Sequence, residues 1–171
     1  NRFTLRHATV FSALVSLPVY SQFTAGNICV YEVGTGSNYP INGGPVIIRE
    51  FSPDGTPGMS VPLPTTGPNA LIAATSVNVG ITRTPPGDRL VIPGYANTIP
   101  YQPANFINES SGTAAPRVVG TLDGAGTFTR MYSSTTLLSG QTIRSAASDG
   151  TNFWVAGQTG GIAYFGPGAP C

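Results

Sequence analysis

The sequence predicts an all-β protein, and three observations support that prediction. Glycine (22) and proline (16) together exceed a fifth of the 171 residues, which opposes long helices and requires many turns. Hydrophobic residues make up 40% of the chain, which is too many for a disordered polypeptide. From Phe23 onward, short apolar runs alternate with turn signals, and no window sustains a helical apolar stripe.

The expected strands follow one another at short intervals. A β-branched run at 28–33 ends in the glycine loop 34–38, and the run 45–51 ends in the turn 52–55. Residues 59–63 are expected to return as an edge strand, because Pro62 cannot donate a ladder hydrogen bond. Later strands are expected near 77–81 and at 89–92, 153–157 and 162–165.

Internal similarity is the most informative feature of the sequence. The pattern of residues 45–56 recurs at 116–127, and residues 87–94 are paralleled by 150–157 in the same order. We therefore expect two repeats, about 45–96 and 116–166, within one β domain at 22–171. Each repeat of about 65 residues has the size of one antiparallel, blade-like sheet. Two such units would form either a propeller-like arrangement or an open sandwich.

A resemblance supports the same fold. The run from Phe23 to Gly34 resembles the opening strand of large secreted β-propeller-like repeat proteins of bacteria, and 149–157 and 160–164 resemble their inner strands. The resemblance covers roughly residues 23–166. It rests on strand and turn patterns alone, without a catalytic signature. Proteins of that kind have no assigned molecular function, so the resemblance implies a fold and export from the cell.

Residues 1–21 differ from the rest of the chain. Arg2 and Arg6 precede an apolar run at 9–19 that has the length of a signal-peptide core and is too short to span a bilayer. A small-residue cleavage pattern follows Pro18. The segment is therefore expected to be a signal peptide. Alternatively, it is retained and pairs as a donor strand with the open sheet edge of a neighbouring subunit.

The cysteines agree with an extracellular or cell-surface location. Cys29 and Cys171 lie near opposite ends of the mature chain, and an even number of cysteines in an oxidising compartment suggests one disulfide. Two unrelated buried thiols, or pairing between chains, are the alternatives. Asn108 begins an N-glycosylation sequon, which would make the protein a glycoprotein.

Charge excludes some partners and favours others. Charged residues are only 9% of the chain, there is no lysine, and the formal net charge is +1. Nucleic-acid binding would need clustered basic residues, which are absent from the sequence. A surface with so little charge is poorly protected against self-association, so we expect a homo-oligomer.

The residue types argue against an enzyme. The only histidine, His7, lies in the segment expected to be removed, and lysine is absent, so no catalytic triad, Schiff-base site or histidine-based metal site is expected. No cofactor or metal is expected either. Most aspartates adjoin glycine and are expected to form turns, whereas Glu50 ends a strand beside Arg49 and is expected at the surface.

Aromatic residues are the remaining candidates for binding. Phe153, Trp154, Tyr164 and Phe165 could form a sugar-stacking platform, but alternating aromatics in strands usually fill a core. Tyr95, Tyr101 and Phe106 lie in a region rich in proline and asparagine, where they are expected to face a ligand.

Two functions remain. The favoured one is an extracellular, non-enzymatic structural subunit that self-associates through sheet edges into an oligomer or filament. The alternative is a carbohydrate-recognition module, or a fragment of a larger propeller protein.

Overall fold

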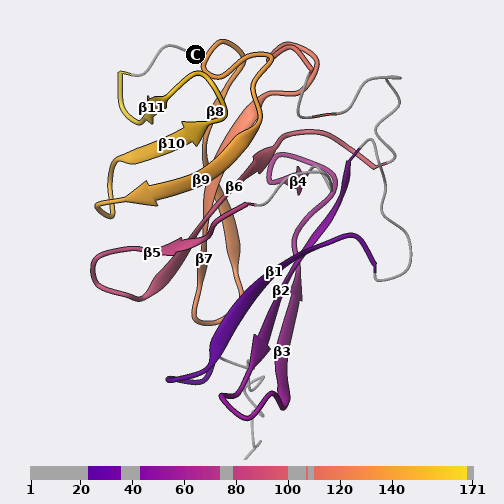
Figure 1. The fold of residues 1–171 in the computed structure, drawn as a ribbon, viewed down its shortest axis with the longest axis vertical. Helices are drawn as coiled ribbons and strands as arrows, with labels where there is room; N and C mark the ends of the chain where they lie inside the picture. The colour runs from indigo at the N-terminus through magenta and orange to yellow at the C-terminus, as the bar shows by residue number, and fades with distance from the viewer. Residues whose placement is uncertain (1–22, 36–42, 74–78, 100–106, 108–109, 169–171) are drawn as a thin grey trace, which may run out of the picture.

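The computed structural model describes residues 23–35, 43–73, 79–99, 107 and 110–168. Within these ranges the chain forms antiparallel β-sheets and no helix, so the all-β prediction is confirmed (Figure 1). The segment 1–21, with both of its predicted roles, lies outside the described residues.

Among the described residues, the larger sheet has eight strands. Its strand order is β1-β2-β4-β6-β7-β8, with β3 also pairing with β2 and β5 with β6. Its members are β1 (Ile28–Val33), β2 (Gly44–Phe51), β3 (Pro57–Pro62), β4 (Ile72–Ala73), β5 (Thr82–Arg83), β6 (Arg89–Tyr95), β7 (Arg117–Asp123) and β8 (Phe128–Ser134). The smaller sheet has the order β11-β10-β9, from β9 (Ile143–Ser148), β10 (Phe153–Gly157) and β11 (Ile162–Phe165).

Both faces of the β6–β7 pair are buried. Val91 and Val119 pack into a cluster with side chains from β9, β10 and β11. Their chain neighbours Ile92 and Val118 pack into a second cluster with side chains from β2 and β3. Since successive side chains of a strand point to opposite faces, β6–β7 is a middle layer between β1–β3 and β9–β11 (Figure 1).

The sequence similarity corresponds to a shared hairpin turn. In the β2–β3 turn, Ser52 donates its backbone N–H to Thr56 and Gly55 donates to Ser52. In the β7–β8 turn, Asp123 donates to Thr127 and Gly126 donates to Asp123 in the same way. Gly55 and Gly126 have positive φ values of 87° and 82°. Each turn needs glycine at this position because other residues are strained there.

The two expected repeats do not form separate sheets. β6, from the first expected repeat, pairs along its whole length with β7, from the second. β2 has three neighbouring strands, whereas β7, its counterpart in sequence, has two. The hairpins are thus alike, but their surroundings in the sheets differ.

Candidate functional site

Tyr95 is buried, which corrects the expectation that it lies exposed where a ligand could reach it. Its side chain is fully buried at the end of β6. The Tyr95 hydroxyl accepts a hydrogen bond of 3.0 Å from the backbone N–H of Ile143, and the guanidinium of Arg117 lies 5.3 Å from the ring centre. Arg117 is itself fully buried and donates to the carbonyls of Ala115 and Gln141. Tyr95 therefore belongs to a packed polar cluster between the two sheets.

Four other predicted site residues lie outside the described residues. They are Tyr101, Phe106, Asn108 and Cys171. Cys29, on β1, is in no disulfide within the described part of the chain, and burial raises the pKa of its thiol, with a further rise from the nearby Glu50 carboxylate. The pairing of Cys29 with Cys171 and the glycosylation of Asn108 therefore stay predictions.

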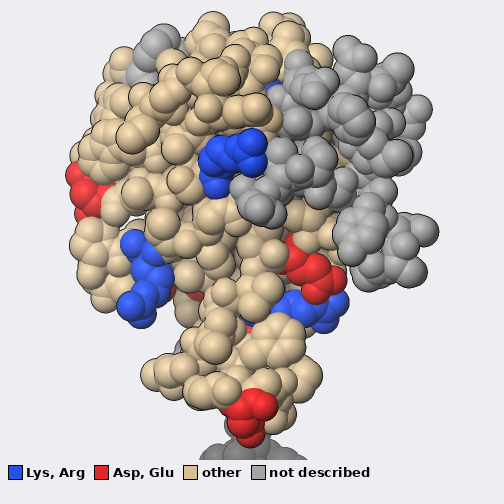
Figure 2. Space-filling model, viewed as in Figure 1, with Lys and Arg blue, Asp and Glu red and all other residues tan. Residues whose placement is uncertain are grey.

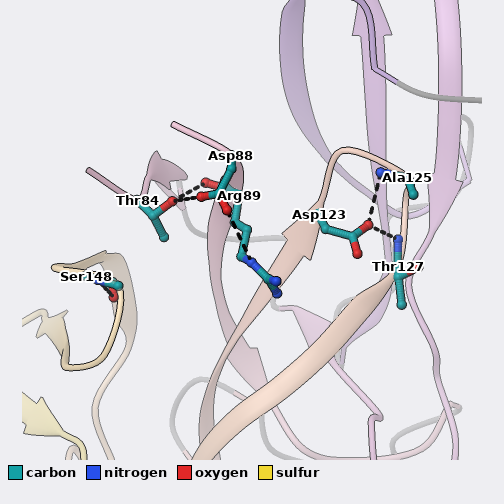
Figure 3. Close-up of polar contacts among 8 residues, drawn as sticks. Thr84, Asp88, Arg89, Asp123, Ala125, Thr127 and Ser148 are labelled. Atoms are coloured by element: carbon teal, nitrogen blue, oxygen red, sulfur yellow. Dashed lines mark hydrogen bonds and ion pairs between the residues drawn. The ribbon is translucent and has the colours of Figure 1, made fainter. Parts of the chain in front are cut away.

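A cleft of about 370 Å³ lies between the segment before β1 and two turns of the larger sheet. Four charged side chains line it: Arg83, Asp88, Arg89 and Asp123. The carboxylates of Asp88 and Asp123 accept hydrogen bonds within their own turns, as Figure 3 shows. Asp88 accepts from the Thr84 hydroxyl, and Asp123 accepts from the backbone N–H groups of Ala125 and Thr127. The expectation that aspartates form turns is confirmed here.

The cleft offers little for acid–base chemistry. Its carboxylates are turn caps, and its one thiol, Cys29, has a raised pKa that favours the protonated, less nucleophilic form. Figure 2 shows few charged side chains on a largely uncharged face, with one acidic and one basic group side by side. Among the described residues, no group of three or more potential ligands could hold a metal ion.

Glu50 is buried, which corrects the expectation that it lies at the surface. It points to the same side of β2 as the core residues Val46 and Ile48. Its carboxylate accepts from the backbone N–H of Thr24 at 2.5 Å, the Asn27 side chain at 3.0 Å and the backbone N–H of Met59 at 2.8 Å. These hydrogen bonds lower the pKa of Glu50.

The outward face of the smaller sheet presents two aromatic rings. Phe153 and Phe165 are buried as expected, but Trp154 and Tyr164 are 39% and 37% exposed, so the core prediction is wrong for these two. They are direct cross-strand partners, with ring centres 6.2 Å apart and ring planes inclined by 52°. The Tyr164 hydroxyl donates to Asn152 at 2.7 Å.

β1 forms an open edge of the larger sheet. Among the described residues it pairs only with β2, in continuous register from Ile28 opposite Phe51 to Val33 opposite Val46. Ile28 and Val30 point outward and are 55% and 42% exposed. The one charge on the strand, Glu32, is paired with Arg49 of β2.

Comparison of the chain with models of protein families, with curated proteins and with solved structures finds no match. Over the described ranges, no helix is long and apolar enough to cross a membrane.

Proposed function

We propose that this chain is a non-enzymatic structural subunit of the cell exterior that associates with further copies through the open edge of β1. The observation behind the proposal is the lack of protection along this strand. Proteins usually protect an open edge with lysine, proline, a bulge or an unpaired charge. β1 has no lysine or proline, its register with β2 is unbroken, and its only charge is neutralised by Arg49.

The edge strand β3, on the other side of β2, differs from β1 in its protection. β3 also pairs only with β2 among the described residues, but it begins at Pro57 and ends at Pro62. Proline cannot donate a ladder hydrogen bond, so this edge is a poor template for another strand. The protection of β3 and not of β1 favours β1 as the strand that acquires a partner.

The choice of partner strand decides the form of the assembly. Pairing of β1 with β1 of a second copy around a two-fold axis closes a dimer. Pairing of β1 with another open edge, such as β11, leaves one free edge of each kind and extends into a filament. β11 pairs only with β10 in the described sheets and contains neither proline nor a charged residue.

The proposed assembly is compatible with the expected propeller-like organisation. One core cluster lies on each face of β6–β7, and β1 and β11 belong to the strands on the two outer sides. Further layers, from other copies or from a longer chain, would continue the stack. The signal-like residues 1–21 support a location outside the cell.

Light scattering after size-exclusion chromatography tests the proposal with the Val30→Lys variant. We expect the unmodified chain to be oligomeric and the variant to associate at least about tenfold more weakly, because a lysine on an edge strand opposes its pairing with another strand. Val30 is exposed in the single chain, so the fold should tolerate the change.

Thr66→Lys is the matched control, since it adds the same charge on an exposed loop away from β1. The control should have the mass of the unmodified assembly. A discrete single-chain mass for the unmodified protein at high concentration, or equal masses for both variants, would contradict the proposal.

A further inference from the structure

The outward face of the smaller sheet has the features of a binding surface, and it lies apart from the β1 edge. Two rows of side chains cross its three strands. One row is Tyr164, Trp154 and Ala147. The other is Ile162, Ala156 and Ser145. The partner of Trp154 on β9 is the small residue Ala147, and the Trp154 side chain is 39% exposed.

The aromatic pair is held in place by hydrogen bonds at one end of the face. The Tyr164 hydroxyl donates to the side-chain oxygen of Asn152, and the Asn152 amide donates to Asp149 at 2.8 Å. Asp149 is fixed in turn by the backbone N–H groups of Thr151 and Asn152. The ring of Tyr164 is therefore preorganised, and its oxygen retains capacity to accept a hydrogen bond from a ligand.

The charge of the face indicates which ligand it suits. Neither row contains an acidic or basic residue. The π-faces of Trp and Tyr carry partial negative charge, which attracts the weakly positive C–H groups on one face of a sugar ring. Anionic polymers would find no cation in either row. From these features we infer that Trp154 and Tyr164 form a binding site for an uncharged oligosaccharide.

The inclination of the rings narrows the class of ligand. A flat crystalline polysaccharide needs coplanar aromatic rings, whereas the planes of Trp154 and Tyr164 are inclined by 52°. Successive sugar units of a soluble chain can rotate about their linkages and contact both rings. The site therefore takes a single soluble chain and does not adsorb to a crystalline surface.

Trp154 is the only tryptophan of the chain, so its fluorescence reports directly on this face. The full chain is titrated with cellohexaose, mannohexaose, chitohexaose and maltohexaose, with fluorescence and calorimetry as readouts. We expect at least one hexasaccharide to change the Trp154 emission and to release heat at millimolar concentrations or below. Calorimetry should give binding at least about tenfold weaker for Trp154→Ala and about threefold weaker for Tyr164→Phe, which keeps the ring.

Met131→Ala is the matched control, because Met131 is an exposed apolar residue on β8, in the larger sheet. It should bind as the unmodified chain does. The inference is overturned if none of the four sugars binds, or if Trp154→Ala binds as tightly as Met131→Ala. It is also overturned if Trp154→Ala converts an oligomer into single chains, because the face would then be an interface between copies. Val30→Lys, which tests the β1 edge, should leave sugar binding unchanged, so the two proposals fail separately.

Discussion

At the scale of single residues, Glu50 connects the segment before β1 to both strands of the β2–β3 hairpin. Its hydrogen bonds to Thr24, Asn27 and Met59 are made to the charged carboxylate and lower its pKa from the ordinary value of 4.5. A carboxyl group whose pKa is lower in the folded state than in the unfolded state stabilises the fold at pH values above the unfolded-state pKa. That stabilisation is lost as the pH falls through the folded-state pKa.

Replacing Glu50 with glutamine should therefore lower the urea midpoint of unfolding at pH 7. An amide has one acceptor oxygen in place of two, and its NH₂ group would face backbone donors. At pH 3 the difference from the unmodified protein should shrink, because the carboxyl of the unfolded chain is protonated there and this favours unfolding of the native protein. Asp88→Asn, on an exposed turn, is the control. A Glu50→Gln deficit of equal size at both pH values would contradict this account.

The sequence held a signal for Glu50 and for the exposed aromatics. Val46, Ile48 and Glu50 alternate along one side of β2, and Phe153 and Trp154 necessarily point to opposite sides of β10. The sequence did not show which face of each strand is buried. The buried face depends on which other strands pack against it, so Tyr95 was wrongly expected to be exposed and Trp154 wrongly expected to be buried.

At the scale of elements, Gly120 marks an irregularity in the central strand β7. The register with β8 shifts between Val119 and Gly120. A Cβ atom at Gly120 would lie 2.5 Å from the ring of Phe128 and 2.6 Å from the carbonyl oxygen of Thr129. Close approach of a neighbouring backbone is a common reason for glycine in a strand.

Gly120→Ala should consequently destabilise the protein by about 1–3 kcal/mol, because a buried strand must shift to admit the methyl group. Chemical denaturation measures the change. Gly124→Ala, in the following turn, should change stability by less than about 0.5 kcal/mol, since a Cβ there meets no atom within 4 Å. Equal effects of the two substitutions would show that packing around Gly120 is looser than described.

Turns and edge strands were easier to predict from the sequence than the pairing of distant strands. The turn at 52–55 was predicted because turn residues act locally, and the turn at Gly126 agrees with the recurrence of the 45–56 pattern at 116–127. The edge position of β3 was predicted from Pro62 for the same reason. The pairing of β6 with β7 was not predicted, because it joins strands that the sequence similarity assigns to different repeats.

At the scale of the whole molecule, β1 pairs with one strand only among the described residues, in a protein with few charges. The sequence anticipated association from composition, but it could not identify the strand. That required knowing that β1 pairs only with β2 in the described part of the chain, that Ile28 and Val30 are exposed and that Arg49 pairs with Glu32. Each of these facts depends on register, which short-range patterns do not determine.

Hydrogen exchange of the β1 amides across a range of protein concentrations tests the central claim most directly. In an antiparallel edge strand, alternate backbone N–H groups point away from the paired neighbour and remain open to solvent. We expect these amides of Ile28–Val33 to exchange rapidly in dilute protein and to become protected as the protein associates, with Val30→Lys abolishing the change. Exchange that stays equally rapid at all concentrations, while the protein nonetheless associates, would show that copies meet elsewhere and would contradict the role assigned to β1.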